Sequence, residues 1–280
     1  VGRMGTYHVG ILSELDKVEL SAVVDIDSKS RKVIEKNYET LGFDNYRDIY
    51  DKIDVAVVAV PTGMHYPIAK DLLNAGIHVL LEKPCANKLD HARELFQLAQ
   101  DKNLILHIGH VERFNGAVQE LHKIVESPLF VECKRMGPFT ERIKDDGVIL
   151  DIMIHDIDII NTLINSPVIK VNATGVAVVS DTIDIANARI EFKNGSVANM
   201  TASRISVKKM RKMRIFEKNR YFSIDFLKNI VELHSISNIN KDIVSTKHSS
   251  ESNNALYDEL NDFALAIMQR QGVSVDINSA

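Results

Sequence analysis

The chain has 280 residues, with 34 lysines and arginines against 38 aspartates and glutamates, which gives a formal net charge of −4. An apolar content of 45% and a charged content of 26% are typical of a globular domain. Because basic residues are not in excess, the charge does not favour a nucleic-acid or membrane partner. No apolar run approaches the ~18 residues of a membrane span. The two cysteines, Cys85 and Cys133, form no CxxC pair, and we expect a reduced, cytoplasmic protein without a metal.

The first part of the chain alternates β-branched apolar runs with helical patterns. Expected strands cover 19–25, 54–61, 77–84 and 104–110, and expected helices cover 28–42, 65–76 and 87–103. The strand runs are apolar on both faces, as in sheets covered by helices on both sides. This rhythm predicts a doubly wound parallel sheet in an N-terminal domain of residues 1–110.

The second part of the chain, residues 111–280, changes its pattern. After expected helices at 111–126 and 148–164, strands follow one another at 168–178, 184–192, 196–205, 213–219, 221–226 and 230–236. Consecutive strands without crossover helices indicate an α+β domain on an open, mostly antiparallel sheet. The polar stretch 238–254 is expected to be a surface loop.

The opening stretch VGRMGTYHVGIL reads as the second half of a dinucleotide-binding turn formed by Gly2, Arg3, Met4 and Gly5. Asp25 follows Gly5 by 20 residues, at the end of the next expected strand, where a carboxylate accepts the ribose hydroxyls of NAD. NADP is disfavoured, although Arg31 weakens that preference. The alternative is a helix that merely begins after glycines. Because the first glycine and strand of the motif are absent, we expect the natural chain to be longer, and its end also looks truncated.

The stretch LLEKP places Glu82, Lys83 and Pro84 at the carboxyl end of a strand, where ligands bind in open α/β sheets. Pro84 keeps the preceding residue out of helical geometry. Lys83 is therefore a candidate proton shuttle or hydroxyl ligand. The alternative is a surface Glu–Lys pair before a loop.

In DIMIHDID, Asp151 and His155 are four residues apart and share one face of an expected helix, so the carboxylate can orient the imidazole for acid–base chemistry. The alternative is an acid near a helix start beside a solvated histidine. Three further residues are candidates for contacts with the nicotinamide or the substrate: His110, Arg113 and Asn115 of GHVERFN. Their alternative role is structural, with Arg113 paired to Glu112 or to a carbonyl.

In PTGMHY, Pro61, Thr62 and His65 lie near the expected cofactor edge, where His65 is more simply explained by packing. His8, on the first expected helix, has a weaker claim still.

Together, GRMGxxH, Asp25, PTxxH, EKP, GHVERFN and DxxxHD resemble the Gfo/Idh/MocA family of oxidoreductases. The resemblance implies a Rossmann domain that binds NAD(P), with Lys83 and His155 as proton-transfer residues and Asp151 as the partner of His155. It implies cofactor contacts from Gly2, Arg3, Met4, Gly5, Asp25, Pro61, Thr62, His65, Glu82 and Lys83. It implies substrate contacts from Lys83, Arg113, Asn115, Asp151 and His155.

More narrowly, RMGPFTER (135–142) and ANARIEFKNGSVANMTASR (186–204) are similar to the branch that oxidises the 3-hydroxyl of UDP-N-acetylglucosamine. Gly116 departs from the proline common after the asparagine. Arg135, Arg142 or Lys208 could contact a diphosphate. The alternatives are a dehydrogenase of a polyol such as inositol or of another sugar, and a non-catalytic NAD-responsive regulator. The family resemblance also implies a homodimer or homotetramer formed through the C-terminal sheet.

Overall fold

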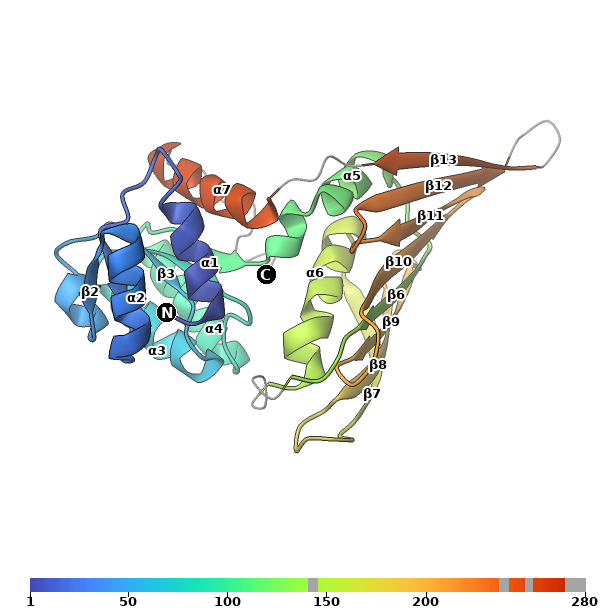
Figure 1. The fold of residues 1–280 in the computed structure, drawn as a ribbon. Coiled ribbons are helices and arrows are strands. Elements are labelled where there is room, and N and C mark those ends of the chain that lie inside the picture. Colours follow the sequence, from blue (N-terminus) through green and yellow to red (C-terminus); the bar gives the residue numbers. More distant parts are fainter. Residues whose placement is uncertain (141–145, 237–241, 250–253, 270–280) are drawn as a thin grey trace. The chain divides into compact units, whose positions relative to one another are not determined.

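The computed structural model describes residues 1–140, 146–236, 242–249 and 254–269 (Figure 1). The chain divides into two compact units. The first unit comprises Val1–Val111 and the chain from Leu256 onward, which includes the last described helix, α7 (Ala255–Gln269). The second unit comprises Glu112–Ala255. The seam lies one residue from the predicted boundary. The prediction of one C-terminal domain over 111–280 is corrected at α7, which joins the first unit.

The first unit has the predicted alternation of strands and helices. Its strands are β1 (Ala22–Val24), β2 (Leu41–Phe43), β3 (Val55–Val58), β4 (His78–Glu82) and β5 (Leu106–Gly109). Its helices are α1 (Arg3–Leu12), α2 (Ser28–Tyr38), η1 (Tyr46–Ile49), η2 (Thr62–Met64), α3 (His65–Asn74) and α4 (Leu89–Asp101), with α7. All strand pairs in this unit are parallel, as predicted. They form two sheets, β1–β2 and β3–β4–β5, because no described strand pairs with both β1 and β3.

The core of this unit explains why α7 belongs to it. Leu80 of β4 is fully buried and packs in one cluster with Ile11 of α1 and with Leu260 and Phe263 of α7. Burial of a large apolar side chain contributes about 1.5–3 kcal/mol, so these contacts hold the returning helix firmly. The sequence between β13 and α7 gave no signal of which unit the helix would join.

The second unit is built on an eight-stranded sheet in the order β13-β12-β11-β10-β6-β9-β8-β7. Its strands are β6 (Phe130–Met136), β7 (Val168–Val176), β8 (Ile185–Phe192), β9 (Val197–Ser203), β10 (Met210–Glu217), β11 (Arg220–Asp225), β12 (Ile230–Ile236) and β13 (Ile243–Ser249). All pairs are antiparallel except β6–β9, which confirms the mostly antiparallel sheet.

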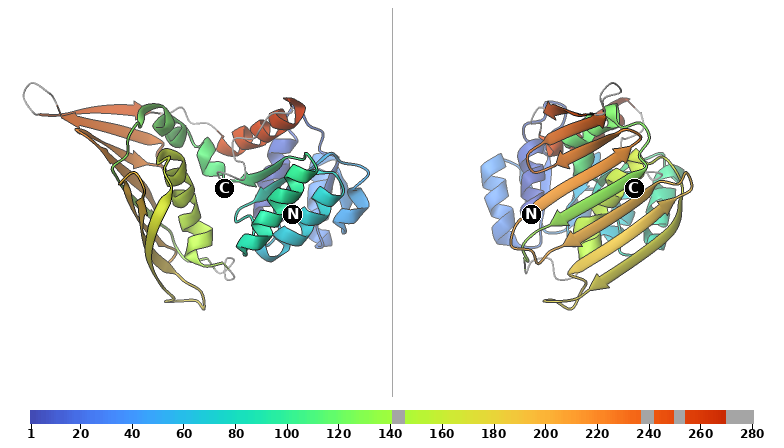
Figure 2. Two further views of the ribbon diagram at one scale, coloured as in Figure 1. Left: turned by 180° about the vertical axis from the view of Figure 1, so that it is seen from behind. Right: turned by 90° about the vertical axis from the view of Figure 1, so that its right-hand side faces the viewer.

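Helices of the second unit cover one face of this sheet (Figures 1 and 2). They are α5 (Gly116–Ile124), the single π-helical turn η4 (Ile149–Met153) and α6 (Ile154–Leu163), and the short helix η3 (Val111–Phe114) precedes α5. The core between helices and sheet includes Leu121, Ile159 and Phe222, each fully buried. We call the sheet face that carries these helices the helix face and the opposite one the open face.

Three strands were not predicted. β2 lies where the helix 28–42 was expected to end, and β13 lies within the expected loop 238–254. β6 sits in the middle of the sheet, and its buried position 135 is an arginine, which hides its alternation. No helix in the described part of the chain is long and apolar enough to cross a membrane.

Candidate active site

The amino end of α1 has the features of an anion-binding site. Gly2 is the residue that precedes the first turn of α1. Among the described residues, no side chain accepts a hydrogen bond from the first N–H groups of this helix. A Cβ added at Gly2 would meet no described atom within 4 Å, so a ligand has room to approach this backbone. Uncapped N–H groups at a helix start bind phosphate groups. The segment Gly2, Arg3, Met4 and Gly5 therefore fits the pyrophosphate of a dinucleotide.

Asp25 lies directly after β1, at the carboxyl end of the strand. Its side chain is about one-fifth exposed, and one carboxylate oxygen accepts the Asp27 backbone N–H at 2.8 Å. Arg31 donates to the Asp25 carbonyl oxygen at 2.6 Å. The Asp25 carboxylate thus stands where the ribose of NAD is bound in dinucleotide folds, and Arg31 contacts the backbone of the same residue.

The ends of β3 and β4 bring the other predicted cofactor residues to one edge. Both strands run parallel with β5, so Pro61 and Thr62 after β3 and Glu82 and Lys83 at the end of β4 lie at the same carboxyl edge. Lys83 is half-buried. The edge at which ligands bind in open parallel sheets thus carries the predicted lysine.

His65 has a structural role at this edge. Its ring is buried, with Nδ1 at 2.8 Å from the Pro84 carbonyl oxygen and Nε2 at 2.9 Å from the Val60 carbonyl oxygen. Both ring nitrogens thus lie within hydrogen-bond distance of backbone carbonyls, and the cofactor contact of His65 stays a prediction. The packing interpretation of His65 fits these contacts.

Glu82 is also buried, and its two oxygens have separate partners. Oε1 lies 2.7 Å from Nε2 of His8, and Oε2 accepts the backbone N–H of Lys83 at 3.3 Å. Gly109 pairs with Glu82 across β4 and β5, and a Cβ there would lie 3.1 Å from Oε2. The absence of a side chain at position 109 makes room for this carboxylate.

A second buried carboxylate faces the same region from α7. Glu259 is fully buried, and Nε2 of His107 lies 3.7 Å from its Oε1, which is longer than a hydrogen bond. Burial and the nearby Glu82 charge raise the pKa of Glu259 well above its usual value. The Glu259 carboxyl therefore holds its proton to a higher pH than an exposed glutamate does.

In the second unit, Asp151 lies in the π-helical turn η4 and His155 in the first turn of α6. Both side chains are half-buried. The helix predicted over 148–164 is present, but it begins with the wider π turn, a feature found frequently at functional sites. The predicted spacing of four residues between the carboxylate and the imidazole thus spans the junction of the two helix types.

Arg113 and Asn115 are used by the fold. Arg113 forms a two-point contact with the buried Asp158 of α6: Nε donates at 2.8 Å to one oxygen and Nη2 donates to the other. Asn115 caps α5 by accepting the Ala117 N–H at 2.9 Å. Arg113 thus anchors α6 and Asn115 begins α5, and the substrate contacts of these two side chains stay a prediction.

Arg135 holds α6 to the sheet and cannot serve a diphosphate. It is 3% exposed, donating from Nε to Asp156 at 2.9 Å and from Nη1 to Glu112 at 3.0 Å. Arg211 of β10, about half exposed, donates to the same Glu112 oxygen at 3.0 Å. Lys208 is exposed in the loop before β10. Arg142 lies outside the described residues.

A buried arginine supports the start of η4. Arg204 donates from Nε to Asp184 at 2.8 Å and from Nη1 to the Asp146 carbonyl at 2.6 Å. Asp184 also accepts the N–H groups of Val178 and Val179 at 2.7 Å, and these bonds lower its pKa. The network fixes the chain that enters the helix carrying Asp151.

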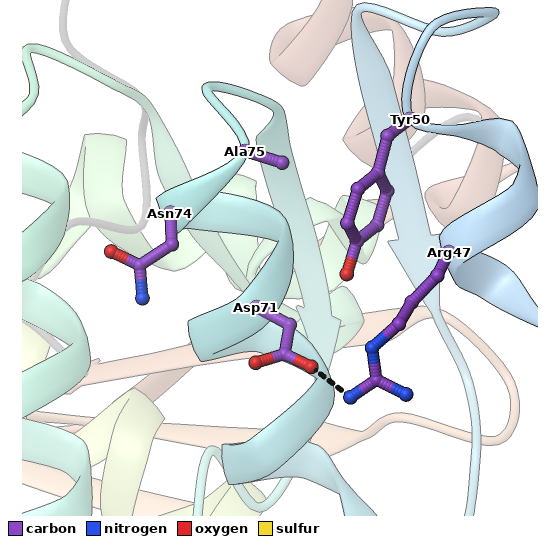
Figure 3. Close-up of a pocket in the computed structure, with 5 residues that line it drawn as sticks. All are labelled: Arg47, Tyr50, Asp71, Asn74 and Ala75. Atoms are coloured by element: carbon purple, nitrogen blue, oxygen red, sulfur yellow. Dashed lines mark hydrogen bonds and ion pairs between the residues drawn. The ribbon is translucent and has the colours of Figure 1, made fainter.

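A separate pocket of about 420 Å³ lies between η1 and the end of α3 and is lined by Arg47, Tyr50, Asp71, Asn74 and Ala75 (Figure 3). Arg47 donates to Asp71 at 2.5 Å, and Tyr46 donates to the same oxygen at 2.8 Å. Because α3 ends where β4 is about to begin, this pocket lies at the amino edge of the strands, away from Lys83. Within the described residues, no group of three or more His, Cys, Asp or Glu side chains could hold a metal ion.

Comparison with known proteins gives two matching family models. Residues 1–110 match the oxidoreductase family with an NAD-binding Rossmann fold, and residues 108–220 match the GFO/IDH/MocA C-terminal domain. Among curated proteins, UDP-N-acetylglucosamine 3-dehydrogenase of Acidithiobacillus ferrooxidans is 34% identical over 235 residues, covering 84% of this chain and 74% of that protein. Myo-inositol 2-dehydrogenase of Thermotoga maritima is 26% identical, covering 74% of this chain and 67% of that protein.

Solved structures show the same pattern. The crystal structure of the Acidithiobacillus ferrooxidans enzyme matches with a TM-score of 0.93 and 31% identity, covering 100% of this chain and 90% of that one. A levoglucosan dehydrogenase in complex with NADH matches with a TM-score of 0.88 and 17% identity, covering 99% of this chain and 90% of that one, which establishes the shared fold alone. Both domains of the chain are thus accounted for by one architecture.

Proposed function

Because the chain belongs to the Gfo/Idh/MocA family of oxidoreductases, we propose that it is an NAD-dependent dehydrogenase of a sugar hydroxyl. The substrate we propose is a UDP-N-acetylhexosamine, oxidised at its 3-hydroxyl to the ketone. The observation that carries this choice is the 34% identity over 84% of the chain to a UDP-N-acetylglucosamine 3-dehydrogenase. The matched region includes residues from both units.

The first unit supplies the cofactor contacts in this proposal. The uncapped start of α1 holds the pyrophosphate, and the Asp25 carboxylate accepts the ribose hydroxyls. A 2′-phosphate would be repelled by that carboxylate, which favours NAD over NADP. Pro61, Thr62 and Lys83, at the ends of neighbouring strands, border the nicotinamide end.

Proton transfer is assigned to Lys83 and His155. His155, oriented by Asp151, takes the proton of the substrate hydroxyl directly or through Lys83. The Lys83 ammonium holds the developing alkoxide. Bound NAD supplies the acceptor for the hydride that leaves the same carbon. The O–H bond and the C–H bond break, and the products are the ketone, NADH and one proton held by the protein.

Contacts to a nucleotide diphosphate are assigned to the exposed cations of the sheet. Lys208 and Arg211 flank the start of β10, and Arg211 shares its residue parity along β10 with the buried Met213 and Ile215, which places it on the helix face. Arg211 can turn from Glu112 to a phosphate, because Glu112 keeps its bond to Arg135.

We also propose that the protein works in the cytoplasm as a homo-oligomer. Both cysteines are free thiols, and burial raises the pKa of Cys85 to about 12, so its thiol is unreactive. The open face carries an aromatic row formed by Phe130, Phe216, Tyr221 and His234, and the edge strand β7 exposes Val168, Ile169 and Val171. Apolar surface of this kind marks association surfaces.

The test is NAD reduction by the purified protein, followed by NADH absorbance. UDP-N-acetylglucosamine, UDP-glucose and myo-inositol are offered in parallel, with Lys83→Ala and His155→Ala beside the parent. We expect turnover of the UDP-amino sugar alone and its loss in both variants, by about 10²- to 10⁴-fold. Turnover of myo-inositol alone would replace the substrate, in line with the similarity to an inositol dehydrogenase. Tight NADH binding without turnover of any compound would favour the regulatory alternative.

A further inference from the structure

Lys83 sits in a chain segment that two histidines hold from opposite sides. Glu82 precedes it, with Oε2 accepting the Lys83 N–H at 3.3 Å and Oε1 bound by His8 at 2.7 Å. Pro84 follows it, with its carbonyl oxygen 2.8 Å from Nδ1 of His65. The Lys83 backbone is therefore tied on its amino side to α1 and on its carboxyl side to α3.

Both histidines are buried, so a polar group that loses its hydrogen bond to one of these rings cannot bind water in its place. His8 and His65 are each 1% exposed, and Glu82 is 9% exposed. A buried polar group without a partner costs about 1–3 kcal/mol, so the loss of either ring would make its partner group move. The groups that would move are the Glu82 carboxylate and the Pro84 carbonyl, one residue to each side of Lys83.

We propose that His8 and His65 are positioning residues that fix the Lys83 backbone between them, and we call them the histidine clamp. His8 lies on α1 three residues after Gly5, so the clamp connects the proposed cofactor-binding helix to the end of β4, beside Lys83. Neither ring needs to touch cofactor or substrate. The inference rests on the proposed function of Lys83 for its effect on turnover, though not for its geometry.

The clamp explains two features that the proposed chemistry leaves unused. His8 of α1 and Glu82 at the end of β4 are buried against each other, where an apolar pair would pack without a desolvation cost. Gly109 leaves the space beside Glu82 open, because a Cβ there would lie 3.1 Å from its carboxylate and 3.2 Å from its Cα. The neighbouring strand is thus shaped to accept the clamped carboxylate.

The test separates the two hydrogen bonds of His65. The amide nitrogen of asparagine can replace Nδ1, whereas that of glutamine can replace Nε2. His65→Asn therefore keeps the bond to Pro84, and His65→Gln keeps only the bond to Val60. We expect His65→Gln to lower kcat by about 10- to 100-fold with little change in KM, as for a misplaced reacting group. His65→Asn should retain most of the activity.

His8 is tested in the same way. His8→Leu removes the bond to Glu82 and should lower kcat as His65→Gln does, while His8→Gln, whose amide nitrogen can replace Nε2, should restore it. His91→Leu is the matched control, because His91 belongs to α4 of the same unit, stacks on Tyr66 and lies outside the clamp. The control should keep the parent kcat.

A second measurement does not depend on turnover. Reductive methylation with ¹³C-formaldehyde labels Lys83, the Lys83→Arg variant identifies its NMR signal, and the signal reports where the amine lies. We expect the signal to shift in His65→Gln and His8→Leu and to stay in His65→Asn, His8→Gln and His91→Leu. If no sugar is oxidised but these shifts occur, the proposed function fails and the clamp stands. Parent-like kcat and an unshifted signal in His65→Gln and His8→Leu would overturn the clamp. If His8→Leu does not fold, the comparison of His65→Gln with His65→Asn decides.

Discussion

The two units of the molecule neutralise their buried carboxylates with different partners. In the second unit, Asp156, Asp158 and Asp184 are each bound by an arginine. In the first unit, the buried Glu82 is bound by His8, and the buried Glu259 lies 3.7 Å from Nε2 of His107. The described parts of the two units thus rely on different chemistry for the same task.

The difference matters because the two partners respond differently to pH. An arginine stays charged at every pH a protein meets, whereas a histidine titrates in the physiological range. Two of the arginine pairs tie α6, which carries His155, to its neighbours: Arg135 binds it to β6 and Arg113 binds it to η3. The histidine pairs surround the strand that carries Lys83. We therefore expect pH sensitivity to be concentrated in the first unit.

The largest effect should come from breaking an arginine network. Arg135→Leu removes the arginine that binds the buried Asp156 and, among the described residues, it leaves Glu112 with only the half-exposed Arg211. Removing one side of a buried ion pair costs about 3–5 kcal/mol, and we expect that loss in the free energy of unfolding measured by denaturant titration.

A triple variant tests the cause of that loss. Combining Arg135→Leu with Glu112→Gln and Asp156→Asn also removes the two carboxylate charges that Arg135 bound. Most of the lost free energy of unfolding should then return. If Arg135→Leu alone costs less than about 1 kcal/mol, the network does not hold α6 to the sheet in the way described.

The sequence predicts the apolar parts of both units well. The run VAVV of β3 and the fully buried run of β4 are fixed by burial on both faces, and the turn KNG correctly places the β8–β9 hairpin. β6 and β13 were missed for a physical reason. β6 buries Arg135 where an apolar residue was needed for a clear alternation, and β13 is a polar edge strand in a serine- and lysine-rich stretch.

Sequence patterns mark the candidate site residues, but they do not give the contacts that these residues make. Glycines, Asp25 and EKP are visible as spacings, but the partners of Arg113 and His65 are decided by distant backbone and side-chain groups. A sequence pattern does not reveal the role of His8, because its partner, Glu82, is 74 residues away along the chain. The signal that could have found it is a lone histidine on the apolar side of a helix, beside Val9 and Ile11.

A smaller effect should appear in the pH dependence of stability in the first unit. The pKa of Glu259 is raised by burial and by Glu82, so the folded protein keeps a proton that the unfolded chain releases near pH 4.5. The free energy of unfolding must then fall as the pH rises from that value to the folded pKa. Glu259→Gln removes this term, so its stability relative to the parent should rise with pH over the same window, as thermal or chemical unfolding at a series of pH values would show.

A carboxylate with the opposite shift is the control for that measurement. Lys70 and Tyr66 lower the pKa of the exposed Glu94, so its contribution is present above the unfolded pKa and is lost as the pH falls through the folded one. Glu94→Gln should therefore be less stable than the parent at neutral pH and equal to it in acid. A Glu259→Gln curve parallel to that of the parent would mean that Glu259 is ionised in the folded protein.

The smallest effect on stability, and the sharpest on assembly, is expected on the open face of the second unit. Arg214 lies 3.4 Å from Glu132 there, and its guanidinium lies over the rings of Phe216 and Tyr221. An exposed ion pair contributes about 0–1 kcal/mol, so Arg214→Glu should hardly change monomer unfolding. If copies of the chain associate through this face, the same change replaces the cation beside Glu132 by a second carboxylate on each partner. The negative charges gathered at the interface would then repel one another. Sedimentation velocity should then show a parent oligomer that dissociates in Arg214→Glu and persists in Lys52→Glu, an equal charge reversal in the first unit. An Arg214→Glu protein that keeps the parent's oligomeric state would place the interface elsewhere, and the aromatic row would need another explanation.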